Sequence, residues 1–367
     1  MACGRPWTCG LEEGGMTEAP HDAFHDPRDR GGPRQPLLSV SGLIKHFPVN
    51  KGLLGRGKTV VRAVDGVDFD LLKGETLGIV GESGCGKSTT ARLLMHLIPP
   101  DHGEIVFDGE SVGRDLPLPD YRRQTQMVFQ DSYASLNPRL TIEESIAFAP
   151  RVHGVPRREA LGRAHDLLAR VGLEPHRFAG RYPHELSGGQ RQRINIARAL
   201  ALEPRLVILD EAVSALDKSV EAQVLNLLLD LKDAFGLTYI FISHDLNVVR
   251  FMADRVMVMY LGKVAEIGSA QQVFEQPSHP YTAALLNSMP AMDPDARTET
   301  APLYGDPPNP INPPPGCRFH TRCALTAPIC SEIEPTLADV DTGQKVACLM
   351  RQAGSGHPSA VPALEMV

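Results

Sequence analysis

The feature that most constrains this chain is a glycine-rich loop between an apolar run and a helical pattern. Residues 81–88 read Gly-Glu-Ser-Gly-Cys-Gly-Lys-Ser and fit the pattern G-x-x-x-x-G-K-[ST]. The run before them, Thr76–Val80, is the kind of sequence found in a strand buried on both faces. Apolar residues then recur with helical spacing over 91–98. Strand, loop and helix in this order predict a phosphate-binding loop in an α/β domain.

The residue types of the loop explain how it would hold a nucleotide. Its glycines let backbone N–H groups approach phosphate oxygens, and the following helix N-terminus favours negative charge. We expect Lys87 to meet the β- and γ-phosphates of ATP and the Ser88 hydroxyl to bind Mg²⁺. Cys85 fills the variable position, where a small buried side chain is the better interpretation. The loop residues expected to bind the nucleotide are Gly81, Ser83, Gly84, Cys85, Gly86, Lys87, Ser88 and Thr89.

A second apolar run ends in two carboxylates. Leu206–Leu209 precedes Asp210 and Glu211. Ligands of parallel sheets bind at the carboxyl ends of the strands. We therefore expect Asp210 to hold Mg²⁺ through water and Glu211 to polarise the attacking water. A further run at 239–242, with a helical pattern between the two, predicts a parallel sheet covered on both sides.

Composition limits the class of protein. The 367 residues are 42% hydrophobic, and the net charge of −7 provides no global attraction for nucleic acid. No apolar run is long enough to span a membrane, and residues 1–36 lack the pattern of a secretion signal. We expect a cytosolic protein that meets a membrane only through a partner. Residues 1–36 are interpreted as a disordered leader in which Met16 is an alternative start.

Five further motifs carry a family resemblance. The segment Leu186–Gln190, Leu-Ser-Gly-Gly-Gln, resembles the signature motif of the ABC-transporter ATPases. Around it, in the order of that family, lie residues that resemble its adenine-stacking aromatic, its Q-loop glutamine, its D-loop and its switch histidine. These are Phe47, Gln130, Ser214–Asp217 and His244.

The resemblance implies a fold and a role for each motif. It implies an ABC-type P-loop ATPase domain over 37–288, with a parallel RecA-like core sheet, an antiparallel β-subdomain and a helical subdomain at about 132–186. His244 would touch the γ-phosphate beside Glu211, Gln130 would join Mg²⁺, and Asp217 would link the two sites of a dimer. The signature residues would contact the nucleotide of the opposite subunit; they are Ser187, Gly188, Gly189 and Gln190. Because Glu211 is present, we expect a hydrolysing subunit.

The segments around 129–139, 182–186 and 278–282 resemble the dipeptide/oligopeptide importer branch, as does a C-terminal extension at 289–350. That branch implies a second, homologous but distinct ATPase subunit, two transmembrane permease subunits and an extracytoplasmic solute-binding protein. It implies no nucleic-acid partner and a peripheral position on the cytoplasmic face of the membrane. Nickel, glycosides, opines or antimicrobial peptides remain alternative cargoes, because this subunit does not touch cargo. The tail at 351–367 is interpreted as disordered.

Four of the seven cysteines lie in the extension: Cys317, Cys323, Cys330 and Cys348. Their spacing, C-x5-C-x6-C-x17-C, is unlike the paired knuckles of zinc sites. Four thiolates in a cytosolic chain suit an iron–sulfur cluster. The resemblance implies a [4Fe-4S] cluster on these residues, and the alternative is four reduced thiols.

Two other classes fit less well. Soluble ABC proteins that act in DNA repair or on ribosomes usually carry a long coiled coil or two fused ATPase units. Here there is one phosphate loop, and the interval from Gln130 to Ser187 is too short for such a coiled coil. A regulatory or binding module would tolerate loss of Glu211, which this chain retains.

Overall fold

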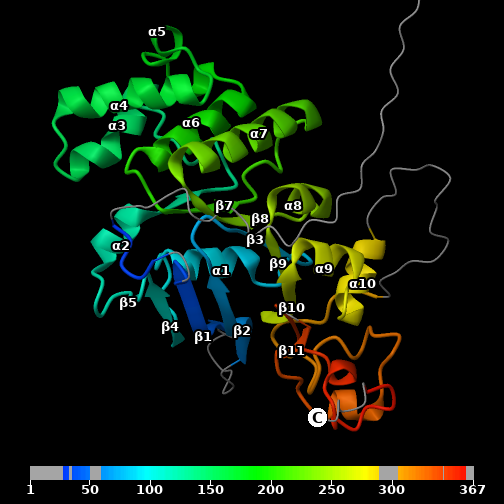
Figure 1. Cartoon of the computed structure of the whole chain (residues 1–367). Coiled ribbons are helices and arrows are strands. Elements are labelled where there is room, and N and C mark those ends of the chain that lie inside the picture. The colour runs from blue at the N-terminus through cyan, green and yellow to red at the C-terminus, as the bar shows by residue number, and fades with distance from the viewer. Residues whose placement is uncertain (1–27, 33–34, 50–58, 289–304, 342, 361–367) are drawn as a thin grey trace, which may run out of the picture.

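The architecture comes from a computed structural model, shown in Figure 1. It describes residues 28–32, 35–49, 59–288, 305–341 and 343–360. Two sheets and a group of helices make up most of the structure, and two strands of the C-terminal extension join the edge of the larger sheet. None of the helices in these described ranges is both long and apolar enough to cross a membrane.

The smaller sheet is antiparallel and has the strand order β2-β1-β4-β5. Its strands are β1 (Leu38–Val49), β2 (Thr59–Leu71), β4 (His102–Phe107) and β5 (Glu110–Ser111). Buried and exposed positions alternate at the end of β2, where Val67, Phe69 and Leu71 face the core. The antiparallel β-subdomain that the family resemblance implies is thereby confirmed.

The larger sheet has the order β11-β12-β10-β9-β3-β8-β7-β6. Its strands are β3 (Thr76–Val80), β6 (Thr125–Val128), β7 (Leu206–Asp210), β8 (Thr238–Ile242), β9 (Arg255–Tyr260), β10 (Lys263–Ser269), β11 (Ala338–Asp341) and β12 (Gln344–Val346). The five from β9 to β6 are parallel. Every residue of β3, β7 and β8 is buried, which confirms the core sheet expected from their continuous apolar runs.

The two faces of this sheet belong to different hydrophobic cores. On β7, Ile208 joins the core shared with the smaller sheet, whereas Val207 and Leu209 join the core under the helices. Helix α1 (Lys87–Leu94) packs into the first core. Helices α7 (Lys218–Phe235) and α8 (Leu246–Met252) pack into the second. Covered faces leave the strand ends as the place where polar side chains gather.

The helical part lies far from the smaller sheet in Figure 1. It contains α3 (Ile142–Val152), α4 (Arg157–Arg170), α5 (Pro175–Phe178) and α6 (Gly188–Leu200). Thr141 begins α3 with a capping box that includes Glu144. The remaining helices are α2 (Leu118–Gln124), α9 (Ala270–Glu275) and α10 (Pro280–Asn287).

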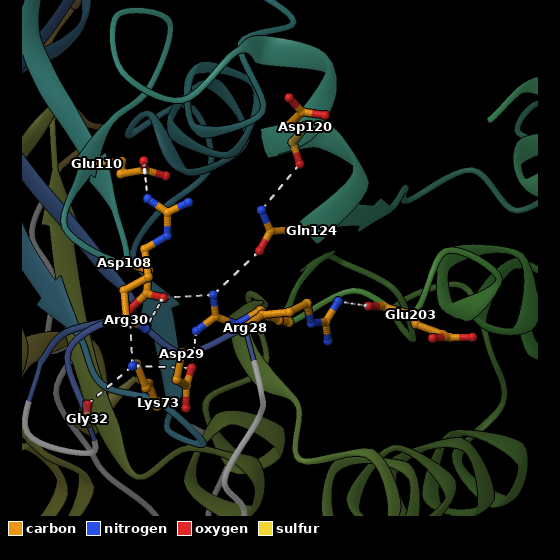
Figure 2. Close-up of polar contacts among 11 residues, drawn as sticks. Arg28, Asp29, Arg30, Gly32, Lys73, Asp108, Glu110, Asp120, Gln124 and Glu203 are labelled. Atoms are coloured by element: carbon orange, nitrogen blue, oxygen red, sulfur yellow. Dashed lines mark hydrogen bonds and ion pairs between the residues drawn. The ribbon is translucent and has the colours of Figure 1, made fainter. Parts of the chain in front are cut away.

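The structure differs from the expected disordered leader, residues 1–36, near the C-terminal end of that segment. Arg28 Nη1 donates to the Glu203 carbonyl oxygen over 2.9 Å, and Asp29 lies 3.2 Å from Lys73 Nζ (Figure 2). The Arg30 amide donates to the Asp108 carboxylate over 3.1 Å. A polar segment predicts disorder, but ion pairs and hydrogen bonds with distant residues hold 28–32 in place. Residues 1–27 lie outside the described ranges.

The tail differs from expectation as well. Its residues 351–360 pack on the extension, where His357 Nε2 lies 3.1 Å from the Leu325 carbonyl oxygen and His357 is buried. Gln352 Nε2 donates to the Thr336 hydroxyl over 3.3 Å. These local contacts follow from the fold of the extension, which the Gly/Pro/Ser-rich composition did not reveal. Residues 361–367 lie outside the described ranges.

Candidate active site

The phosphate loop connects β3 to α1 through glycines that no other residue can replace without a clash. Gly81 has φ 146° and Gly86 has φ 114°, both in the left-handed half of backbone space. A Cβ atom on Gly81 would lie 2.2 Å from the Met259 carbonyl oxygen, and one on Gly86 would lie 2.3 Å from that of Ala63. The loop is therefore held between β9 and β2, with the start of α1 at its end.

Lys87 bonds to the loop itself. Its Nζ donates to the Gly81 carbonyl oxygen over 2.7 Å and to that of Glu82 over 3.1 Å, and the side chain is buried. The ammonium group thus lies against the phosphate loop, whose backbone is expected to wrap around the phosphates of a nucleotide. The same ammonium is 3.8 Å from Cys85 Sγ, a thiol whose pKa is raised by burial. Cys85 is a buried, uncharged side chain, as expected.

Two of the three side chains expected to bind Mg²⁺ contact each other. Ser88 Oγ, on the first turn of α1, donates to Asp210 Oδ1 at the end of β7 over 2.9 Å. Burial raises the pKa of Asp210, and the neighbouring Glu211 carboxylate adds to the rise. A hydroxyl and a carboxylate at this distance are hard oxygen ligands of the kind that Mg²⁺ takes alongside phosphates and water.

Three side chains from different segments meet beside them. Gln130 Nε2 donates to Glu211 Oε2 over 2.7 Å, and His244 Nδ1 lies 3.6 Å from the same oxygen. Glu211 has φ 49°, a left-handed conformation that costs a non-glycine residue roughly 1–2 kcal/mol. Its amide donates to the Ile242 carbonyl oxygen over 2.9 Å, which fixes this turn to β8. Such strain is typical of functional positions.

The signature segment begins α6. Ser187 Oγ accepts from the Gln190 amide over 3.3 Å, and Gln190 Oε1 accepts from the Ser187 amide over 3.0 Å. Ser187 is exposed. A Cβ atom on Gly189 would lie 2.4 Å from Val220 Cγ1, so a glycine lets α6 approach α7 closely. The contact of this segment with a second subunit stays a prediction.

Asp217 and Phe47 have local partners in the described chain. Asp217 caps α7, where its Oδ1 accepts from the Val220 amide over 3.1 Å, and this bond is the main cause of its lowered pKa. Phe47 lies on β1 opposite Val61, and its ring centroid is 5.7 Å from Lys45 Nζ. The same strand, β2, carries Ala63, whose carbonyl oxygen lies close to Gly86 of the phosphate loop. The roles of Asp217 across a dimer and of Phe47 on adenine stay predictions.

The four cysteines of the extension form one group of free thiols. The Cys317 amide donates to the Cys330 carbonyl oxygen over 2.8 Å. The pKa of Cys317 is raised to about 12 by burial, and Cys348, Cys330 and Cys323 add to the rise. Among the described residues, however, no set of three or more His, Cys, Asp or Glu is placed to hold a metal ion. The thiols are neighbours, but the described residues form no metal-binding group.

Sequence reasoning missed the contacts of Glu82. Its amide donates to the hydroxyl of Tyr281 over 2.9 Å, and Tyr281 is fully buried on α10. The sequence marks the segment 278–282 only as a feature of the importer branch. Its tyrosine in fact contacts the phosphate loop, and no local pattern signals a contact between residues so far apart in the chain.

Comparison with family models matches two parts of the chain. Residues 64–214 match the model described as ABC transporter. Residues 265–330 match the model described as oligopeptide/dipeptide transporter, C-terminal region. The first region contains the phosphate loop and the signature, and the second contains three of the four clustered cysteines.

Curated proteins match over nearly the whole chain. The oligopeptide transport ATP-binding protein AppF of Bacillus subtilis (strain 168) is 50% identical over 86% of this chain and 97% of the relative. The dipeptide transport ATP-binding protein DppF of Escherichia coli (strain K12) is 49% identical over 86% of this chain and 94% of the relative. The probable peptide ABC transporter ATP-binding protein y4tS of Sinorhizobium fredii is 49% identical over 90% of this chain and 95% of the relative.

Solved structures show the same fold in the ATPase part. CbiO1 from Clostridium perfringens, part of the ABC transporter complex CbiONQ, aligns with a TM-score of 0.56 and 29% identity, over 66% of this chain and 91% of that chain. The ATP-binding cassette MJ0796, solved as a dimer in a post-hydrolysis state with ADP and phosphate, aligns with a TM-score of 0.54 and 29% identity. That match covers 64% of this chain and 98% of the other.

Proposed function

Because this chain belongs to the ATP-binding, ATP-hydrolysing subunits of the ABC-transporter family, we propose that it powers the import of dipeptides or oligopeptides. The family binds ATP with Mg²⁺ and acts with membrane permeases. Support for peptides as cargo comes from the names of the AppF, DppF and y4tS relatives, and from the oligopeptide/dipeptide C-terminal region at 265–330. Nothing in those names favours nickel, glycosides, opines or antimicrobial peptides.

The observation that carries the catalytic assignment is the meeting of Gln130, Glu211 and His244 beside the Ser88–Asp210 pair. In the proposed mechanism, Lys87 and the loop amides bind the phosphates of ATP. Ser88, Asp210 and Gln130 hold Mg²⁺, directly or through water. Glu211 orients and polarises the attacking water, and His244 stabilises the γ-phosphate as charge develops there.

We infer that the complete sites form between two ATPase subunits. The exposed Ser187 at the N-terminus of α6 is suited to bind the γ-phosphate of a facing subunit, since a helix N-terminus attracts anions. The partner is a homologous but distinct ATPase, and two permease subunits bind the pair at the cytoplasmic face of the membrane. An extracytoplasmic binding protein delivers the peptide. ATP joins the subunits, and loss of the γ-phosphate contact separates them.

The cargo assignment predicts how peptides change ATP turnover. The complete complex with its binding protein in liposomes is expected to hydrolyse ATP faster when dipeptides or oligopeptides are added. Nickel chelates and glycosides are expected to have no effect. A complex carrying Glu211→Gln is the control, in which the peptide effect should disappear. Stimulation by another class of solute would leave the ATPase assignment intact and would assign a different cargo.

We also propose that Cys317, Cys323, Cys330 and Cys348 bind a [4Fe-4S] cluster. Support comes from their grouping in one small module, where the Cys317 amide donates to the Cys330 carbonyl oxygen over 2.8 Å. When bound, the cluster would cross-link a module that has little core of its own.

Iron content tests the cluster directly. Protein purified without oxygen is expected to contain about four iron and four sulfide per chain, with broad visible absorbance. Cys330→Ser should lose the iron, whereas Cys85→Ser, at a buried thiol outside the module, should keep it. Iron-free protein under these conditions would mean that the four residues are reduced thiols.

A further inference from the structure

Arg322 reaches from the cysteine module into the phosphate loop. Its Nη1 donates to Glu82 Oε2 over 2.7 Å and its Nη2 donates to Glu82 Oε1 over 3.0 Å. The Arg322 side chain is 5% exposed and that of Glu82 is 21% exposed, so water screens this two-pronged pair weakly. Arg322 immediately precedes Cys323, and Glu82 is the second residue of the loop.

All three polar parts of Glu82 are held. Arg322 binds its carboxylate, the Tyr281 hydroxyl accepts from its amide over 2.9 Å, and Lys87 donates to its carbonyl oxygen over 3.1 Å. Tyr260 completes the arrangement, because its hydroxyl accepts from Arg322 Nη1 over 3.3 Å and its ring centroid lies 4.6 Å from that of Tyr281. One residue of the phosphate loop is thus fixed from β9, α10 and the extension together.

The module is docked at a second point that does not involve Glu82. Arg318, which is buried, forms an ion pair with Asp65 on β2 and donates to the carbonyl oxygen of Leu261. The next residue, Gly262, donates its amide to the Cys85 carbonyl oxygen over 2.8 Å. Arg322 therefore acts on the loop from a module that Arg318 already holds in place.

We infer that Arg322 is a positioning residue for ATP binding. It fixes the phosphate loop through Glu82, so that the C-terminal extension preorganises the nucleotide site. A loop already held in one conformation loses less freedom when the phosphates bind, and this favours affinity. The inference rests on the proposed placement of ATP at this loop. It concerns affinity rather than hydrolysis, because Arg322 acts through Glu82, and the water-polarising role is assigned to Glu211.

The test uses the full-length chain with Arg322→Gln and Arg322→Lys. For Arg322→Gln, the Kd for a fluorescent ATP analogue and the KM for ATP are expected to rise about tenfold, in line with losing a charge-assisted pair. The kcat at saturating ATP should stay within about twofold of the unaltered chain. Arg322→Lys, which keeps the charge but loses the two-pronged geometry, should recover part of the affinity.

Two further variants separate positioning from folding. Glu82→Gln should raise Kd in the same direction, and the double variant should add little to either single change, since both remove one interaction. Arg351→Gln is the matched control, because Arg351 lies in the segment that packs on the same extension but donates to the Ser278 carbonyl oxygen instead. It should leave Kd unchanged. If Arg322→Gln misfolds, Glu82→Gln decides the question by itself.

Three results are decisive. A folded Arg322→Gln chain with unchanged Kd and KM, or with a lower melting temperature alone, would overturn the inference. Equal losses in Arg322→Gln and Arg351→Gln would assign the effect to general damage of the extension. Lys87→Gln distinguishes the inference from the proposed site: if Lys87→Gln also binds ATP normally, the placement of the nucleotide itself is wrong.

Discussion

Replacing Glu211 with glutamine is expected to lower ATP turnover at least about a hundredfold, because an amide cannot polarise the attacking water. The amide oxygen of the new side chain would still accept from Gln130 Nε2, which now bonds Glu211 over 2.7 Å. ATP binding should therefore persist, and the variant should accumulate ATP-bound dimers. Single-turnover hydrolysis together with size-exclusion chromatography in Mg-ATP measures both effects.

The control for this prediction is His244→Ala, which removes a neighbour 3.6 Å from the same carboxylate oxygen and leaves Glu211 in place. It should lower turnover less, because the group that polarises water remains. Wild-type turnover in the Glu211→Gln chain would mean that another residue activates the water. In the assembled complex, wild-type turnover would equally mean that the partner subunit's site supplies the activity, so the chain purified without its partner is the informative sample.

Replacing Lys87 with glutamine is expected to weaken ATP binding roughly a hundredfold. Hydrogen bonds to charged groups contribute about 1.5–3 kcal/mol each, and the loss of about 3 kcal/mol corresponds to that factor. Glutamine keeps a donor for the Gly81 and Glu82 carbonyl oxygens that Lys87 bonds in this structure, so the loop should stay folded. Isothermal titration with ATP and with ADP measures the change.

The lysine variant has its own control in Ser83→Ala, a loop residue that is exposed and forms no bond to Lys87 in the described structure. Ser83→Ala should bind ATP several times better than Lys87→Gln. The loss in Lys87→Gln should be larger for ATP than for ADP, because the ammonium is assigned to the β- and γ-phosphates. Equal losses for the two nucleotides would contradict that assignment.

The fold was predictable where the signal is local. The continuous apolar runs of β3 and β7 indicate burial on both faces without knowledge of their neighbours in the fold. The glycines at 81 and 86 stand at two loop positions where the structure leaves no room for a Cβ atom. The meeting of Gln130, Glu211 and His244 was expected only through the family resemblance. Apolar pattern places each at a strand end but says nothing of which strand ends are adjacent.

Long-range ion pairs and hydrogen bonds were not predictable. Arg322 and Glu82 are separated by 240 positions, and Arg28 and Glu203 by 175. In the sequence, a charged residue in a polar segment gives the same signal whether its side chain pairs with a buried partner or faces water. The same reason explains why the sequence predicts disorder for residues 28–32 and 351–360 although they pack on the domain.

The C-terminal extension covers the β10 edge of the larger sheet. Strand β10 is almost entirely buried, and its outer side pairs with β12 through Glu266 opposite Val346 and Ile267 opposite Lys345. Gln344 Nε2 also donates to the buried Glu266 carboxylate over 2.8 Å. A chain lacking β11 and β12 would present an apolar edge strand with unpaired backbone groups, a template for aggregation. The C-terminal extension, which contacts the phosphate loop through Arg322, thus also protects the ATPase domain from edge-to-edge association through β11 and β12.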